Sequence, residues 1–254
     1  MDYEFTVIVD TRIDKNSKAW FSTRNLREDN GFSVLLKARY RQFLFGFGND
    51  PEIFAHNVEV LGIKLEEVDY ALIPCYEKEV LGGIWHFLEN NEKARIIGVF
   101  DYRGWDLNRE IKEKYGKEVW TNGYSAHMDS PGHRVNSTGS IWRSPRPEHA
   151  LYIQSVKGLI AIAAFSFAGP ANVADFVEGI NYSRKLHMYI GSFAPKPYYY
   201  TEDDIKEMIE QLKEKKVEKV APLFRTDDRT RKALKEVYKD NYIDLGVGSV
   251  LEWY

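Results

Sequence analysis

The stretch "ALIPCYEKEVLGG", residues 71–83, indicates how this part of the chain folds and where it could do chemistry. The segment "VDYALIP" (68–74) predicts a buried strand, and the helical run "IWHFLENN" (84–91) follows Gly82 and Gly83. The polar loop between them carries Cys75, Glu77 and Glu79 but no histidine. The order strand, polar loop, helix predicts an α/β protein with a site at this loop.

Strands alternate with helices on both sides of this stretch. Before it, "FTVIVD" (5–10), "FSVLLKA" (32–38) and "RQFLFGFG" (41–48) predict strands, the last two paired as a hairpin. A helix is predicted over 50–62, because Asp50 can cap it and Pro51 suits its first position. "KARIIGVF" (93–100) predicts another strand. Residues 101–134 show no sustained period, which predicts an irregular lid or insertion.

The second half continues the alternation. Two strands joined at Lys157 and Gly158 are predicted within 149–167, then a helix over 172–179 and a strand over 186–193. Thr201 and Asp204 form a capping box for an amphipathic helix, and "VEKVAPLF", "RTRKALKEVY" and "GVGSVLEW" predict a strand, a helix and a strand. We therefore expect a single α/β domain over 1–254, with mixed β-sheets covered by helices in a four-layer sandwich.

The composition narrows the class of function. The chain has 254 residues, 29% of them charged, and a formal net charge of −3, which counts against nucleic acid as a partner. Cys75 is the only cysteine, so an intramolecular disulfide and a cysteine-cluster zinc site are excluded. The N-terminus lacks the pattern of a signal peptide, and the uncharged run 158–174 is too short for a membrane span. A cytoplasmic protein without membrane association is expected.

Several segments stand out together. In chain order they are "LFGFG" (44–48), "IPCYEKEVLGG" (73–83), "AAFSF" (163–167), "GSFA" (191–194), "PLFRTD" (222–227) and "IDLGVGSV" (243–250). Their wording and order resemble the metallo-β-lactamase fold superfamily, and more narrowly its branch of dihydropterin-ribofuranosylaminobenzene 5'-phosphate synthases. Gly82 and Gly83 and the terminal "GVGSV" are the most specific of these anchors. The resemblance covers nearly the whole chain, and it implies the αββα sandwich and, in the family, a binuclear metal site.

The residues that bind metal in that family are replaced in this chain. The family's ligand positions fall on Cys75, Glu77, Glu79, Val80, Phe167 and Phe224. The aspartate of the family's first turn becomes Gly46, and the last residue of "GSFA" is Ala194. Valine and phenylalanine have no lone pair to offer a metal. The resemblance therefore implies a family member that has lost its binuclear site.

Two alternatives remain for the loop that follows the 68–74 strand. Cys75, Glu77 and Glu79 could be catalytic in a remodelled site, which would either hold one metal or use Cys75 as a nucleophile. Alternatively, the loop faces solvent and its polar residues no longer coordinate anything.

A ligand-binding role is predicted for His127, Ser166 and Arg225. His127 belongs to "SAHMDSPGHR", which lies where the family covers its active site; the alternative is an exposed loop. Ser166 and Arg225 adjoin Phe167 and Phe224, and an arginine can bind a phosphate or a carboxylate. The alternative for this segment is a charged helix N-terminus, in which Asp227 or Asp228 caps the helix that follows.

The sequence favours a protein that has neither a metal nor a cofactor. Such a protein would bind a small-molecule ligand or take part in an assembly, such as a homo-oligomer. The alternative is a metal-dependent hydrolase or transferase that acts on a small, phosphorylated substrate through the remodelled site. A nucleic-acid partner is the weakest candidate, because the chain has no evident basic stripe.

Overall fold

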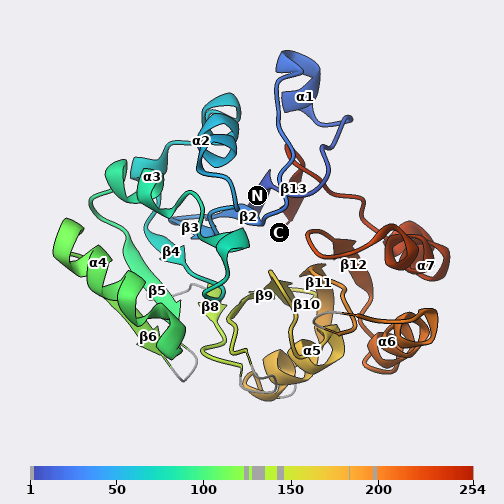
Figure 1. The fold of residues 1–254 in the computed structure, drawn as a ribbon. Coiled ribbons are helices and arrows are strands. Elements are labelled where there is room, and N and C mark those ends of the chain that lie inside the picture. The colour runs from blue at the N-terminus through green and yellow to red at the C-terminus, as the bar shows by residue number, and fades with distance from the viewer. Residues whose placement is uncertain are drawn as a thin grey trace. The chain divides into compact units, whose positions relative to one another are not determined.

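The computed structural model describes residues 3–122, 126–127, 135–141, 146–182, 184–196 and 199–253, and only the backbone of residues 122, 126 and 127. The chain divides into two compact units. Unit 1 comprises Met1–Asn122 and Leu245–Tyr254, and unit 2 comprises Gly123–Asp244. Each unit contains a mixed β-sheet and its own helices (Figure 1).

In unit 1 the described strands form a seven-stranded sheet in the order β13-β1-β2-β3-β4-β5-β6. The pairs from β13 to β3 are antiparallel, and the pairs from β3 to β6 are parallel. β2 and β3 form the predicted hairpin. The strands are β1 (Tyr3–Val9), β2 (Ser33–Ala38), β3 (Arg41–Phe45), β4 (Tyr70–Leu72), β5 (Arg95–Val99), β6 (Val119–Asn122) and β13 (Val250–Trp253).

Three helices of unit 1, α2, α3 and α4, cover one face of this sheet (Figure 1). Phe54, Phe87 and Ile111 bring them into one buried apolar core with residues of β1 to β5. Asp50 caps α2 as predicted, since its carboxylate accepts from the N–H groups of Glu52 and Ile53. The helices are α1 (Lys18–Thr23), α2 (Pro51–Val60), α3 (Ile84–Glu89) and α4 (Trp105–Tyr115), with 3₁₀ turns η1 (Leu65–Glu67), η2 (Lys78–Val80) and η3 (Tyr102–Gly104).

The stretch 71–83 contains the end of β4, a loop with η2, and the two glycines that precede α3. Both glycines permit a close approach to the segment that follows β3. A Cβ atom on Gly82 would lie 2.2 Å from the carbonyl oxygen of Asn49, and one on Gly83 would lie 2.2 Å from the ring of Phe54. Any larger side chain would push the two segments apart, so the glycines fix where the 75–80 loop lies.

In unit 2 the described strands form a six-stranded sheet in the order β12-β11-β10-β9-β8-β7. β10, β11 and β12 are parallel, whereas each neighbouring pair from β10 through β9 and β8 to β7 is antiparallel. The loops that follow β10, β11 and β12 therefore lie at one edge, together with the residues that precede β9. The strands are β7 (Ala126–His127), β8 (Val135–Ser137), β9 (Ala150–Ser155), β10 (Gly158–Ala163), β11 (Leu186–Gly191) and β12 (Lys219–Pro222).

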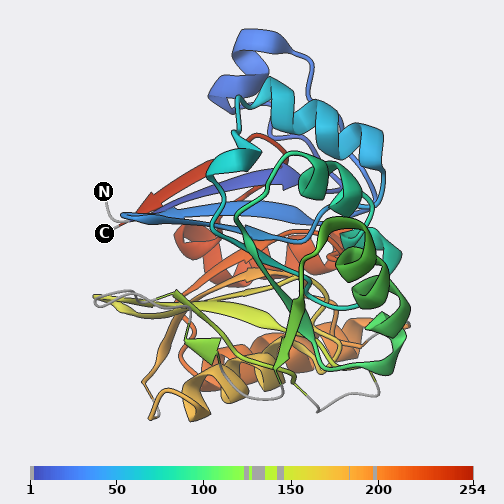
Figure 2. The same ribbon diagram turned by 90° about the vertical axis from the view of Figure 1, so that its left-hand side faces the viewer.

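The helices of unit 2 share one apolar core with this sheet. Figure 2 shows α5 and α6, in yellow to orange, lying along one face of the sheet. Val173, Leu212 and Leu234, one from each helix, join Tyr189 and other strand residues in this core. The helices are α5 (Pro170–Gly179), α6 (Glu202–Glu214) and α7 (Asp228–Tyr238), with the 3₁₀ turn η4 (Lys239–Asn241).

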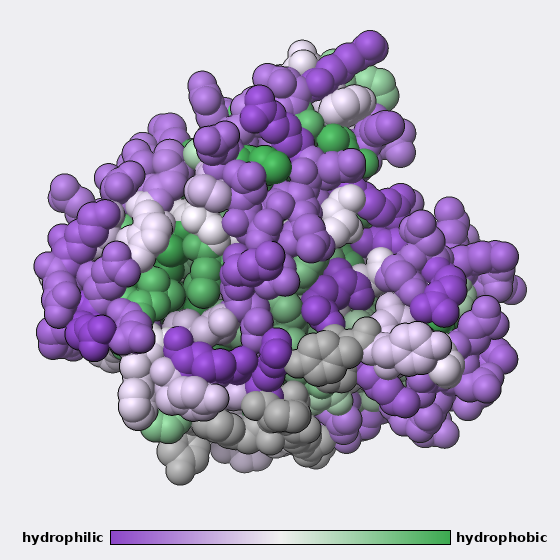
Figure 3. All heavy atoms as spheres, in the orientation of Figure 1, coloured by the Kyte–Doolittle hydropathy of each residue, from purple (hydrophilic) through white to green (hydrophobic). Residues whose placement is uncertain are grey.

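Polar and charged side chains dominate the outer faces of three helices. In Figure 3 the exposed sides of α4, α6 and α7 are mostly hydrophilic. No helix in the described part of the chain is long and apolar enough to cross a membrane.

One sequence-based expectation about local structure is wrong. The first part of 101–134 is regular, because η3, α4 and β6 occupy most of residues 102–122. Leu107, Ile111 and Tyr115 form a narrow apolar stripe on α4 that packs on the core of unit 1, and the many charges around this stripe hide it. Residues 123–125 and 128–134 lie outside the described residues, so a lid role for them stays a prediction.

Candidate functional site

In unit 1, the polar residues lie where β4 and β5 end. These parallel strands place the loops that follow them at one edge of the sheet, which is where α/β proteins bind ligands. The loop after β4 carries Cys75 and Glu77, and the loop after β5 carries Asp101 and Arg103. The Cys75 side chain is completely buried, so the solvent-facing alternative does not describe it. Glu77 and Glu79 are half-buried.

Arg103 joins these two loops of unit 1. Its Nη1 donates to Oε1 of Glu77 at 2.9 Å, and its Nε donates to Oδ2 of Asp101 at 2.8 Å. The hydrogen bond to Asp101 raises the pKa of Arg103, and the charges of Asp101, Glu77 and Cys75 act in the same direction. The carboxylate of Glu77, a predicted catalytic group, is therefore held by a permanently charged guanidinium.

In unit 2, a cluster of aromatic rings lies at the carboxyl ends of β10 and β12. Phe165 and Phe167 stack with ring centroids 4.7 Å apart, and Phe224 meets Phe165 edge to face at 5.4 Å. All three side chains are buried. We call Phe165, Phe167 and Phe224 the phenylalanine cluster.

Two arginines from separate segments lie over the rings of this cluster. The guanidinium carbon of Arg225 is 5.2 Å from the ring centroid of Phe165 and 5.9 Å from that of Phe167. That of Arg146, from the segment before β9, is 5.8 Å from the centroid of Phe167. Two positive charges are thus attached to the apolar cluster by cation–π contacts.

Ser166 fixes the loop between β10 and α5. Its backbone is left-handed, with φ +54°, which is uncommon for a residue with a side chain. The Ser166 hydroxyl lies 2.5 Å from the Tyr189 hydroxyl and donates to the carbonyl oxygen of Ser192 at 2.8 Å. Burial raises the pKa of Tyr189. Ser166 is 1% exposed, so its hydroxyl is engaged inside the protein.

Glu148 is buried beside the same loop. The N–H group of Ser166 donates to its Oε2 at 2.9 Å, and the side chain has 1% of its surface exposed. Burial raises the pKa of Glu148 to about 7, although the N–H groups of Phe167, Ser166 and Ala168 and the charge of Arg225 act in the opposite direction. A carboxylic acid thus lies within the electrostatic reach of Arg225.

The chain was compared with known proteins by sequence and by structure. No protein-family model matches it, and no curated protein matches it in sequence. Among solved structures, a metal-dependent hydrolase of the β-lactamase superfamily is similar over 99% of both chains, with 18% identity and a TM-score of 0.76. The metallo-β-lactamase fold protein YhfI from Bacillus subtilis is similar over 99% of this chain and 100% of its own, with 13% identity and a TM-score of 0.67.

The chain has the metallo-β-lactamase fold. A diphosphatase from the PhnP family agrees with this, at 11% identity, a TM-score of 0.65, and coverage of 99% of this chain and 98% of the other. The fold class predicted from the sequence is confirmed. Identities this low establish the fold and leave the activity to be argued from the residues at the site.

The binuclear metal centre that the resemblance implies does not fit the residues present in this metallo-β-lactamase fold. Val80, Phe167 and Phe224 are buried apolar side chains without a lone pair. Gly46 has φ +76°, and a Cβ atom there would lie 2.5 Å from the carbonyl oxygen of Phe32, so an aspartate cannot take this place. Within the described part of the chain, no three His, Cys, Asp or Glu side chains are grouped to hold a metal ion.

The ligand-binding role predicted for His127 stays a prediction, because His127 belongs to β7, of which the backbone alone is described. The alternative for the segment after Arg225 was a charged helix N-terminus capped by an aspartate. This is confirmed in one respect, because Asp227 caps α7 by accepting from the N–H group of Thr230 at 2.8 Å. Arg225 itself precedes this cap and lies over the phenylalanine cluster.

Sequence reasoning missed Asp101, Arg103, Arg146 and Glu148. Asp101 and Arg103 directly follow a predicted strand, as Cys75 and Glu77 do, and this repeated pattern could have revealed them. Glu148 and Arg146 carry no local signal, because their partners are far away in the sequence.

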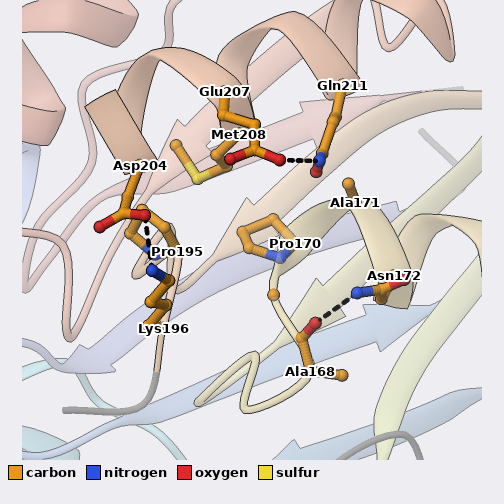
Figure 4. Close-up of a pocket in the computed structure, with 11 residues that line it drawn as sticks. Ala168, Pro170, Ala171, Asn172, Pro195, Lys196, Asp204, Glu207, Met208 and Gln211 are labelled. Atoms are coloured by element: carbon orange, nitrogen blue, oxygen red, sulfur yellow. Dashed lines mark hydrogen bonds and ion pairs between the residues drawn. The ribbon is translucent and has the colours of Figure 1, made fainter. Parts of the chain in front are cut away.

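A further pocket of unit 2 lies between the start of α5, the segment after β11 and α6 (Figure 4). Its volume is about 170 Å³, and the ion pair between Lys196 and Asp204, at 2.6 Å, borders it. Asn172 and Gln211 in its lining bond to Ala168 and Glu207. None of the site residues predicted from the sequence lines this pocket.

Proposed function

We propose that this protein is a metallo-β-lactamase-fold member without the binuclear metal site, and that it acts as a non-catalytic ligand-binding protein. The observation that carries the proposal is the phenylalanine cluster. The resemblance to the dihydropterin-ribofuranosylaminobenzene 5'-phosphate synthase branch assigns metal ligands to Phe167 and Phe224, and both rings pack on Phe165. A buried aromatic cluster offers a metal ion no donors and no hydration, so it disfavours the ion.

Unit 1 supports the same proposal. Glu77 and Asp101 are paired with Arg103, whose positive charge disfavours a cation nearby. The buried Val80 side chain supplies volume in place of a donor. At the described ends of β4 and β5, two carboxylates are thus engaged by an arginine, and Val80 offers no donor.

Metal analysis of the intact protein tests the proposal. The protein is purified without chelator, incubated with zinc, manganese or iron(II), passed through a desalting column and analysed by mass spectrometry of its elements. We expect metal well below one equivalent, because the described residues supply no set of ligands that would retain it.

The variants Cys75→Ser and Glu77→Gln distinguish specific from adventitious metal, and Glu110→Gln on the outer face of α4 is the control. One or two retained equivalents that disappear in the first two variants, and persist in the control, would contradict the proposal. Such a result would establish the remodelled metal site instead.

The alternative function is a metal-dependent hydrolase that acts on a small, phosphorylated substrate. Its support is the similarity in fold to a metal-dependent hydrolase and to a diphosphatase. It requires catalytic roles for Cys75, Glu77 or Glu79, and the two carboxylate variants, Glu77→Gln and Glu79→Gln, would then lose turnover of a phosphodiester substrate while staying folded.

A further inference from the structure

We propose that the pocket between α5 and α6 binds a small organic cation, a primary ammonium group on a short aliphatic body. The pocket belongs wholly to unit 2, and its volume is about 170 Å³. This is roughly six times the volume that one water molecule has in the liquid, which sets the ligand at about six non-hydrogen atoms. None of the residues that carry the proposed function lines this pocket, so the inference goes beyond that function.

The polar side chains on the α6 side of the pocket leave hydrogen-bond acceptors open. The amide nitrogen of Gln211 donates to Oε1 of Glu207 at 3.1 Å. Since a carboxylate only accepts, the nitrogen of this amide must face Glu207, and the amide oxygen points elsewhere. No group in the described part of the chain donates to this amide oxygen or to Oε2 of Glu207. In Figure 4 the pair lies on the α6 side, facing Pro170 and Ala171 of α5.

The segment after β11 adds a third acceptor, the carbonyl oxygen of Pro195. It lies 3.4 Å from the position that a Cβ atom would take on Gly169, which also lines the pocket. Gly169 has φ +85°, a conformation that glycine adopts readily, and the chain turns there into α5. Among the described residues, no N–H group donates to the carbonyl oxygen of Pro195.

The side-chain donors of the lining are already engaged. Lys196 pairs with Asp204 at 2.6 Å, and the amide nitrogen of Asn172 donates to the carbonyl oxygen of Ala168 at 2.7 Å. The amide nitrogen of Gln211 is engaged as well. A pocket with engaged donors and open acceptors is complementary to a ligand that brings donors of its own. A primary ammonium group brings three.

The charge of the lining favours a cation. Asp204 and Glu207 bring two negative charges and Lys196 brings one positive charge, which leaves one negative charge in excess. Asp204 stays ionised at neutral pH, because its hydrogen bond with Lys196 lowers the pKa of the carboxyl to about 2. The start of α5 opposes a cation with a partial charge of roughly +0.5, which is smaller than the excess on the side chains.

Apolar side chains of the same pocket suit the aliphatic body of the ligand. Met208 is 3% exposed, and Pro170 and Ala171 are also buried. A methionine side chain adapts its shape to what it contacts. An ammonium group at the open oxygen atoms and a short carbon chain on these side chains use both parts of the pocket. This combination selects an alkylammonium ion over an inorganic cation.

Calorimetric titration of the full chain with n-butylammonium chloride at neutral pH tests the inference. Tetramethylammonium chloride is the comparison, because it has the same charge and no N–H donor, and sodium chloride keeps the ionic strength equal. We expect n-butylammonium to bind about tenfold more tightly than tetramethylammonium. N-acetyl-lysine methylamide distinguishes two sources of the ammonium group, a free amine and a basic peptide. The source is the one whose probe binds more tightly.

Three variants test the role of the lining residues. Glu207→Gln removes a negative charge from the pocket and should weaken n-butylammonium by about tenfold, as for the loss of a charge-assisted hydrogen bond. Lys196→Met removes the opposing positive charge and should tighten binding by roughly two- to fivefold. Glu210→Gln is the matched control, because Glu210 is exposed on the same helix and does not line the pocket. This variant should bind like the wild type.

The inference is overturned if the wild type binds neither ammonium probe at about 10 mM, well beyond weak millimolar affinity. It is also overturned if tetramethylammonium binds as tightly as n-butylammonium, since charge alone would then explain the binding. Equal binding by Glu207→Gln and Glu210→Gln, or a failure of Lys196→Met to tighten binding, would contradict it too. These outcomes leave the metal analysis untouched, so the proposed function is tested separately.

Discussion

At the scale of the residue, Glu148 shows what burial does to an acid. The folded protein raises its pKa from the ordinary value of 4.5 to about 7, chiefly because burial penalises the charged carboxylate. Between these values the folded protein binds a proton that the unfolded chain has released. The stabilisation from the neutral acid is thus fully present below about pH 4.5 and is lost as the pH rises through about 7.

Glu148→Gln should remove this pH dependence, because glutamine has the shape of the neutral acid and does not titrate. We expect the stability of the wild type relative to Glu148→Gln to fall by on the order of 3 kcal/mol between about pH 5 and about pH 8. Urea unfolding at several pH values measures the difference. Glu110→Gln, on the exposed face of α4, is the control, and a difference between wild type and Glu148→Gln that stays constant with pH would refute the prediction.

At the scale of the element, local sequence explains where helices begin. Thr201 caps α6, where its hydroxyl accepts from the N–H group of Asp204 and the Asp204 carboxylate accepts from that of Thr201 at 2.7 Å. Lys196 adds an ion pair to Asp204, and their hydrogen bond lowers the pKa of this carboxyl to about 2. The capping box was predicted from the sequence because its two partners are three residues apart.

Thr201→Ala should destabilise the protein by about 1 kcal/mol, the usual effect of removing an N-cap oxygen. Thr201→Ser keeps the oxygen and should stay close to the wild type. Chemical unfolding of the three proteins at neutral pH compares them. Equal stability of the alanine and serine variants would show that the cap does not contribute.

Local sequence patterns predicted many of the elements, but not the contacts between the loops at the strand ends. Most strands, the hairpin and the 75–80 loop follow from local patterns, and the structure confirms them, whereas β6, β7 and β8 were not predicted. The helix α4 was missed because its apolar stripe is narrow, with Ile111 as its one buried residue. The pairing of Glu77 with Arg103 was also missed, since 26 residues separate them and no local pattern connects them.

At the scale of the whole molecule, the proposed absence of a metal makes a thermodynamic prediction. A bound metal stabilises the folded state by roughly 4 kcal/mol when its free concentration is 1,000 times the dissociation constant. A protein that needs no metal should therefore unfold at the same temperature with a chelator and with added zinc.

Differential scanning calorimetry of the full chain in the two conditions measures this. The variant Cys75→Ser serves as the comparison, because it removes the one thiol that could retain zinc. A chelator that lowers the unfolding temperature of the wild type but not of Cys75→Ser would show that a metal contributes to its stability.

The sequence by itself determined the alternation of strands and helices, the helix caps and the resemblance that identified the fold, because each depends on residues close together in the chain. The same resemblance predicts which side chains stand where the family has metal ligands, and that assignment stays a prediction. The tertiary structure alone decided which groups meet. Glu148 reaches the N–H group of Ser166, and Arg146 and Arg225 share the ring of Phe167, because parallel strands bring the ends of distant segments to one edge of a sheet.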